Sequence, residues 1–248
     1  MSSEENALER TLRLAAREPA SRPDFYRLLL ESEVYVIGTA QGASGAQTVA
    51  AGDQLSIQNW NKDDGTPVVP FFSSLDLLRR ALTGESGYLS LPARSLFEIT
   101  RGAALVLNPN ADHGKEFFPQ EIEALLSGCL TREPVQRVTQ KQSKVLLGQP
   151  AQYPKAMAEA LSACFGKRAE VNAGYLCLMH DTSQDAKPHL VVGVEVDGDF
   201  DGVLREAGTV AADTVPDGDA VDLFRVVRGE AGLSEYFLKS VKPFYQRD

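Results

Sequence analysis

The sequence is poor in cysteine and has no long apolar run. Its 248 residues include three cysteines, Cys129, Cys164 and Cys177, and no two of them are spaced as Cys-x-x-Cys. An odd number of thiols without metal-ligand spacing is typical of free cysteines in a reducing compartment. The longest apolar runs, such as residues 190–194, are far too short to cross a bilayer, and the acidic N-terminus does not resemble a signal peptide. These absences predict a cytoplasmic protein with no membrane partner.

Basic residues are also scarce. The chain carries 34 acidic and 25 basic side chains, which gives a formal net charge of −9. A chain with this balance repels the phosphate backbone of nucleic acids unless it has a local basic patch. The densest basic stretch, residues 132–144, has no interleaved aromatic residues and is interpreted as part of a solvated linker. We therefore expect no nucleic-acid partner.

Apolar residues make up 43% of the chain, and their spacing predicts two domains. The first domain is expected over residues 1–130, with helical stripes and alternating strand patterns in succession. Its strands are expected at residues 33–38, 55–60, 68–72 and 103–107, with residues 53–72 forming a hairpin. Its helices are expected around residues 8–15, 21–29, 73–82, 91–99 and 119–128.

Residues 131–151 are polar and form the expected linker to a second domain over residues 152–248. This domain shows the order helix, strand, strand, helix, strand, helix. The predicted ranges are residues 153–166, 170–180, 189–196, 200–213, 220–227 and 233–241. Adjacent strands combined with crossovers favour an α+β fold. We therefore predict two α/β-type domains, each with a mixed or antiparallel sheet packed against helices.

Five stretches occur in a recognisable order along the chain. They are PASRPDFYRLLLESEVYVIG (19–38), VVPFFSSLDLLRRAL (68–82), LVLNPNADHGKEFFPQEIEALL (105–126), YPKAMAEALSACF (153–165) and HLVVGVEVDGDFDGVLREAG (189–208). Together they resemble the enhanced serine sensitivity protein family, SseB, over nearly the whole chain. The resemblance implies a cytoplasmic bacterial protein with an N-terminal and a C-terminal domain. It carries no assigned activity and no catalytic residues that can be transferred to this chain.

The polar turn after the strand at residues 103–107 is the first candidate site. In one hypothesis, His113 is a general base oriented by Asp112, and Lys115 binds an anion. In the other, the turn is a structural connection in which Asn108 ends the strand and Gly114 needs a positive φ angle. Asp112 and His113 are adjacent and would point in different directions, so recognition of a partner is favoured over catalysis.

Three aromatic residues of the predicted hairpin form a second candidate surface. Trp60, Phe71 and Phe72 would make a partly apolar patch for a protein partner if they are exposed. The alternative is that they pack in the core of the hairpin, and this alternative is expected for at least two of them.

An acidic turn is the third candidate. Asp197, Asp199 and Asp201 match the start of a calcium-binding EF-hand loop, but the twelfth position, where a bidentate carboxylate is required, is Gly208. The alternative is a turn whose aspartate caps the next helix. The phosphate-loop and nucleophile-elbow spacings are also incomplete. We therefore predict no catalytic residues, no metal site and no cofactor.

Two functions follow as hypotheses. The first is a non-enzymatic cytoplasmic module that binds another protein or regulates it and, through the family resemblance, is linked to serine tolerance. The second is an enzyme or small-ligand sensor with a site in the cleft between the domains, where pockets often occur. The residues do not identify the partner, and self-association is possible in either case.

Overall fold

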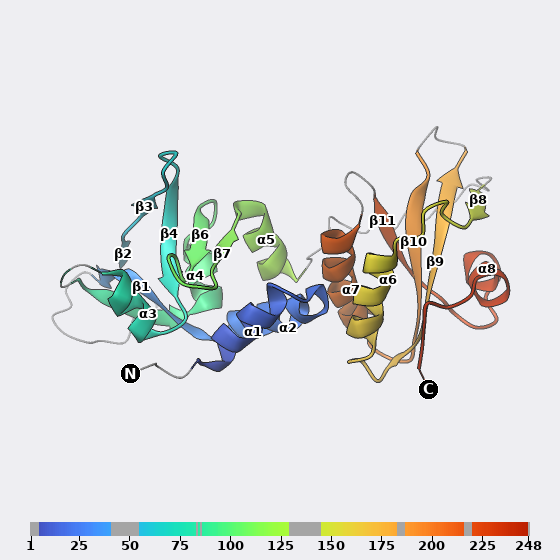
Figure 1. The fold of residues 1–248 in the computed structure, drawn as a ribbon, viewed down its shortest axis with the longest axis horizontal. Coiled ribbons are helices and arrows are strands. Elements are labelled where there is room, and N and C mark those ends of the chain that lie inside the picture. Colours follow the sequence, from blue (N-terminus) through green and yellow to red (C-terminus); the bar gives the residue numbers. More distant parts are fainter. Residues whose placement is uncertain are drawn as a thin grey trace. The chain divides into compact units, whose positions relative to one another are not determined.

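The computed structural model describes residues 5–40, 55–82, 84, 86–128, 145–182, 187–215 and 220–247. The chain divides into two compact units: unit 1 contains Met1–Arg17 and Asp24–Gly128, and unit 2 contains Glu18–Pro23 and Cys129–Asp248. Figure 1 shows the helices and strands of both units, coloured along the sequence. Within the described ranges, no helix combines the length and the apolar character that a membrane span requires.

Unit 1 is built around a mixed sheet. Its strands are β1 (Glu33–Ala40), β2 (Leu55–Ile57), β3 (Trp60–Asn61), β4 (Pro67–Phe72), β5 (Tyr88–Pro92), β6 (Ala104–Leu107) and β7 (Lys115–Phe117). They are ordered β2-β1-β4-β6-β7, with β3 beside β4 and β5 beside β1. β4 and β6 are parallel, and Phe71 lies opposite Leu107. The two strands therefore end side by side, which brings the residues that follow them close together.

Helices cover both faces of this sheet. They are α1 (Ala7–Ala15), α2 (Arg22–Glu31), α3 (Leu75–Ala81), α4 (Ala93–Ile99) and α5 (Pro119–Ser127). On one face, Phe71 packs against Phe97 of α4 and Phe117 of β7, with ring centroids 5.9 Å away in both cases. On the other face, Phe72 packs with Ile37 and with Leu78 of α3. Successive strand residues point to opposite faces, so neighbouring phenylalanines serve two different cores.

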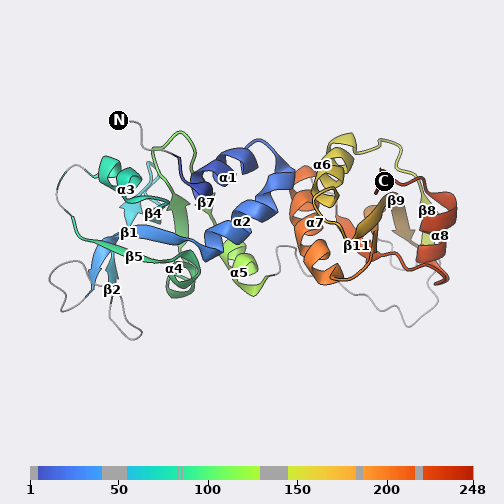
Figure 2. The ribbon, with the colours of Figure 1, turned by 90° about the horizontal axis from the view of Figure 1, so that it is seen from below.

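Unit 2 has three layers. Its strands are β8 (Val145–Gly148), β9 (Val171–Asp181), β10 (His189–Val196), β11 (Val221–Arg225) and β12 (Tyr245–Gln246). Its longer helices are α6 (Lys155–Phe165), α7 (Phe200–Thr214) and α8 (Leu233–Ser240). Figures 1 and 2 show α6 and α7 on one face of the sheet and α8 on the other. The sheet is mixed, because β10 is antiparallel to β9 and parallel to β11.

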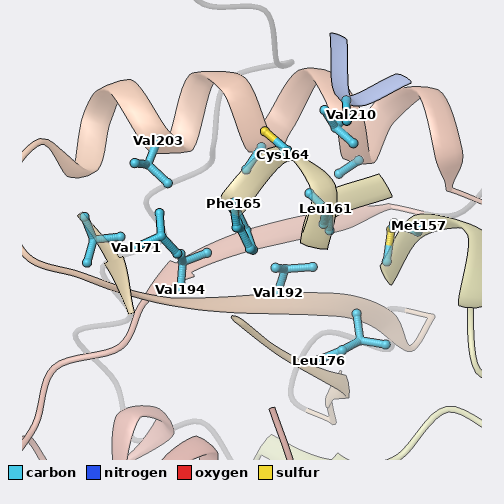
Figure 3. Close-up of a cluster of buried hydrophobic side chains, with 14 of the residues drawn as sticks. Met157, Leu161, Cys164, Phe165, Val171, Leu176, Val192, Val194, Val203 and Val210 are labelled. Carbon is cyan, nitrogen blue, oxygen red and sulfur yellow. The ribbon is translucent and has the colours of Figure 1, made fainter. Parts of the chain in front are cut away.

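Each face of the second sheet has its own apolar core. The larger core lies under α6 and α7, where Leu161 and Phe165 meet Val192 and Val194 of β10 (Figure 3). The smaller core surrounds Phe237 of α8. This division explains why β9 and β10 read as nearly continuous apolar runs: both of their faces are buried.

A short segment from early in the chain completes the larger core of unit 2. The 3-10 helix η1 (Pro19–Ser21) places Ala20 in that core at 7% exposure. Lys167 Nζ donates a hydrogen bond to the carbonyl oxygen of Ala20 at 2.7 Å. Arg22 forms an ion pair with Asp213 of α7 at 2.5 Å. Residues 18–23 therefore belong structurally to unit 2, although the sequence pattern assigns them to the first domain.

The predicted α+β class with mixed sheets is confirmed. Several details differ from the prediction, including the short strand β12, which the sequence pattern does not predict. Residues 55–57 pair with β1 and not with β4, so the hairpin is confined to β3 and β4 around the turn at Asp63. β5 and β7 were not predicted, because each is short and lies beside a helix start. Residues 145–148 form a strand within the range that was assigned to the linker, whereas residues 129–144 lie outside the described part.

Candidate functional site

Asn108 anchors the turn that follows β6. Its φ angle is +49° and it is only 2% exposed. Its Oδ1 accepts a hydrogen bond from the backbone N–H of Ser73 at 2.8 Å, and its Nδ2 donates to Ser73 Oγ at 2.9 Å. Asparagine tolerates the left-handed region better than most residues do. Asn108 therefore meets a backbone requirement and a hydrogen-bonding requirement at the same position.

Ser73 extends this network to the start of α1. Its Oγ donates to Glu9 Oε1 at 2.8 Å, and its carbonyl oxygen accepts from Asn6 Nδ2 at 3.0 Å. Asn6 and Glu9 form the capping box of α1. The network thus joins the ends of two parallel strands to the N-terminus of a helix. Each of these polar groups has a partner, which is the pattern of a structural junction.

The residues proposed as a catalytic group do not form one cluster. Asp112 is exposed and His113 is partly exposed, and no described hydrogen bond joins them. A hydrogen bond from Arg13, with smaller contributions from Arg10 and His113, holds the pKa of Glu5 below its usual value. His113 thus contributes electrostatically at the carboxylate of Glu5. Within the part of the chain that the structure describes, no carboxylate is hydrogen-bonded to His113 to orient it as a base.

Lys115 belongs to a different group of side chains. Its Nζ lies 2.8 Å from Glu121 Oε1 and 4.9 Å from the ring centroid of Phe117. The Tyr26 hydroxyl donates to the same Glu121 oxygen at 3.0 Å. Glu121 balances the ammonium charge, so Lys115 ties β7 to α2 and α5.

The expectation of a positive φ at Gly114 was wrong. In this turn the positive φ angles occur at Asn108 and at Asn110, where φ is +63°. Gly114 is required for a different reason: a Cβ atom there would lie 2.9 Å from the carbonyl oxygens of both Leu107 and Asn108. The chain approaches itself too closely at this point for any larger residue.

The aromatic candidates are mainly core residues. Phe71 and Phe72 are 0% exposed, so they cannot contribute to an exposed patch. Trp60 is half-buried and its ring packs edge-on against Phe72 at 6.3 Å. The reason is that β4 has helices on both sides, which buries both faces of the strand. The alternative of core packing is therefore correct for the two phenylalanines.

The acidic turn caps a helix. Asp199 is the N-cap of α7, and its Oδ1 accepts from the backbone N–H of Gly202 at 2.9 Å. Asp197 Oδ2 accepts from Asn172 Nδ2 at 2.7 Å, and Asp201 lies in the first turn of α7. Within the described ranges, no three His, Cys, Asp or Glu side chains are grouped to hold a metal ion.

Cys164 and Cys177 are buried thiols. Cys177 lies in β9 at 0% exposure and Cys164 lies in α6 at 3% exposure. Burial raises the pKa of the Cys177 thiol to about 12. A thiol that stays protonated is a poor nucleophile and a poor metal ligand. Cys129 lies outside the described residues.

β8 is an edge strand with exposed apolar side chains. It pairs with β9 in antiparallel register, with Leu146 opposite His180. Among the strands that the structure describes, none pairs with its other side. Val145 is 40% exposed and Leu146 is 61% exposed, whereas Leu147 packs into the core around Phe237. The apolar run Val-Leu-Leu within the polar stretch was the sequence signal for this strand.

The fold is that of an α+β protein with two units, each having a mixed sheet. A family model described as the SseB protein N-terminal domain matches residues 8–124, and one described as the SseB protein C-terminal domain matches residues 139–247. The chain belongs to the SseB family.

Two curated relatives match along nearly their whole length. They are Protein SseB of Escherichia coli (strain K12) and Protein SseB of Shigella flexneri. Each is 38% identical to this chain over 247 residues, which is 100% of this chain and 94% of the relative. No solved structure matches the chain.

Proposed function

We propose that this protein is a non-enzymatic cytoplasmic module that binds another protein through the β8 edge of unit 2. The observation that carries the proposal is a strand edge with which no described strand pairs, combined with the exposed side chains of Val145 and Leu146. An exposed edge presents backbone N–H and C=O groups in a row, and an extended segment of a partner can add to it as a further strand. Exposed aliphatic side chains provide the apolar contacts that such a segment needs.

The charge of the chain indicates what kind of segment would fit. At a net charge of −9, the protein attracts positively charged partners and repels acidic ones. The proposed partner segment is therefore extended and apolar, with flanking lysine or arginine residues. The link to serine tolerance implied by the family resemblance is part of the same proposal: cells would need this contact to grow in excess serine. A site between the domains stays a prediction.

The test compares two lysine substitutions in unit 2. Leu146→Lys places a charge on the β8 edge, and Val227→Lys places the same charge at a residue that is 42% exposed after β11. Proteins captured from the native cell by wild type and by both variants are identified by mass spectrometry. A partner that Leu146→Lys loses and Val227→Lys keeps supports the proposal.

Two controls complete the experiment. Sedimentation of the purified chain shows whether the second strand comes from another copy of this protein. Growth in excess serine is then measured in cells that carry only one of the two variants. Retention of every partner by Leu146→Lys, with unchanged growth, would overturn the proposal.

A further inference from the structure

Unit 2 contains a polar pocket that has no role in the proposed β8 contact. Its volume is about 400 Å³, within the range of small-ligand sites. Its apolar wall comes from α8 and the residues after it. Its polar lining consists of Asn172, Tyr175, Glu195, Arg228, Gln246 and Arg247. β8 pairs with residues 178–181 of β9, whereas the pocket is lined by residues 172–175 of the same strand.

Glu195 is the unusual member of this pocket. It lies in β10, in the otherwise apolar run Leu-Val-Val-Gly-Val-Glu-Val, and its side chain is 7% exposed. Its Oε1 accepts a hydrogen bond from Arg228 Nε. Its Oε2 is buried and has no hydrogen-bond partner among the described residues. Buried carboxylate oxygens are normally paired, because leaving one unpaired costs free energy. The unpaired Oε2 is therefore a position that suits a hydrogen-bond donor of a ligand.

Arg228 lies over this carboxylate at the edge of the pocket. Its side chain is 77% exposed, and its ion pair with Glu195 uses only one of the five guanidinium N–H donors. The guanidinium is exposed but the carboxylate of Glu195 is buried, so Arg228 leaves Glu195 only where another positive charge takes its place. A ligand that carries such a charge can therefore reach Glu195 Oε2 as Arg228 moves aside, while the remaining N–H groups of Arg228 are free to bind an acceptor on the same ligand.

The C-terminal strand supplies the second cation. β12 pairs with β9, with Gln246 opposite Ala173, and the backbone N–H of Arg247 donates to the carbonyl oxygen of Asn172 at 2.9 Å. This pairing fixes Arg247 beside the pocket. Tyr175 adds a hydroxyl group: burial, then the charge of Glu195 and a smaller hydrogen-bonding contribution from Glu195 raise its pKa, whereas the charge of Arg228 lowers it. The pocket thus combines one buried acceptor with two guanidinium groups.

We propose that this pocket binds a small zwitterion, with its ammonium group on Glu195 Oε2 and its carboxylate on Arg228 and Arg247. A simple anion would place negative charge beside the unpaired oxygen of Glu195. A simple cation would lie against two guanidinium groups. Only a molecule that carries both charges is complementary to the whole lining. The pocket volume of about 400 Å³ limits this molecule to a small one.

The experiment measures binding to the full-length protein by calorimetry and by chemical shifts. The probes are glycine, β-alanine and γ-aminobutyrate, which differ only in charge spacing, with acetate and methylammonium as single-charge controls. We expect at least one zwitterion to bind, and both controls to fail at the same concentration. Glu195→Gln and Arg247→Gln should each weaken that binding about tenfold or more, because each leaves one ligand charge unpaired.

Matched variants separate a site effect from a change in net charge. Asp222→Asn removes a negative charge at an exposed ion pair, and Lys239→Gln removes a positive charge on the exposed face of α8. Both should bind the zwitterion as the wild type does, and so should Leu146→Lys. Arg247 is exposed near the end of the chain, so its variant tests the site even if Glu195→Gln fails to fold. Absence of zwitterion binding, equal binding of acetate, or binding unchanged in Arg247→Gln would overturn the proposal.

Discussion

Replacing Asn108 by alanine tests whether the turn after β6 is a structural junction. The change leaves the buried N–H of Ser73 without its acceptor at 2.8 Å and removes the donor to Ser73 Oγ. It also places an alanine at a φ angle of +49°. An unsatisfied buried donor costs about 1–3 kcal/mol and a lost hydrogen bond about 1 kcal/mol. The left-handed backbone costs alanine roughly 1 kcal/mol more. We therefore expect Asn108→Ala to lower the free energy of unfolding by about 4 kcal/mol.

The assay uses the single tryptophan of the chain. Trp60 lies in unit 1 and packs on Phe72, so its fluorescence in urea reports the unfolding of that unit. With an m-value of about 2 kcal/mol per molar urea, the midpoint should fall by about 2 M. Asn108→Gly loses the same hydrogen bonds but tolerates the backbone angle, so it should cost about 1 kcal/mol less than alanine. A cost below about 1 kcal/mol for alanine, or a larger cost for glycine, would refute the reasoning.

Three further predictions concern the other candidates. His113→Ala should change the free energy of unfolding by less than about 0.5 kcal/mol, as surface substitutions usually do. Gly114→Val should cost several times more, because its Cβ would lie 2.9 Å from two carbonyl oxygens. Urea unfolding of both variants measures the two costs, and the reverse order would show that the imidazole matters structurally. EDTA should leave the thermal midpoint unchanged, because Asp199 uses its carboxylate to cap α7 at Gly202 and not to bind calcium. A midpoint that EDTA lowers and calcium restores would contradict this prediction. The Cys177 thiol stays protonated in the fold up to a pKa of about 12, while the unfolded thiol ionises above about pH 8.5. The contribution of this thiol to stability is therefore complete below about pH 8.5 and is lost as the pH rises toward 12. Between these pH values, the wild type should lose stability relative to Cys177→Ala. Parallel profiles of stability against pH for the two proteins would contradict this prediction.

The sequence patterns located the strands of unit 2 more completely than those of unit 1, for a physical reason. In the second half, the long strands β9 and β10 are buried on both faces, and their apolar runs are unmistakable. In the first half, β5 and β7 are short, and each is followed directly by a helix that begins at or beside a proline, so the helix signal masked the strand. Strand pairing was the least accessible feature, because nothing local in residues 55–57 distinguishes β1 from β4 as their partner.

The candidate sites show the same limit. The pattern suggested that Asn108 ends a strand and that an aspartate of the acidic turn caps a helix, and the structure agrees on both. It could not show that Phe71 and Phe72 face two separate cores, because burial depends on which helices cover the sheet. Glu195 carried a readable signal, as the one charged residue in an apolar strand, but its unpaired oxygen and its neighbours from β12 emerge only in three dimensions.

The placement of residues 18–23 in unit 2 has a consequence for how the protein is made. A ribosome releases this segment early, but Lys167, which binds the carbonyl oxygen of Ala20, lies 147 residues later in the chain. Chains generally begin to fold from the N-terminus during synthesis. The core under α6 and α7 must therefore wait for a piece that has already left the ribosome, and its closure is a long-range event with a correspondingly slow rate. During that interval Ala20 lacks its contacts in the core of unit 2, so this unit cannot reach its final packing by folding residues 129–248 alone.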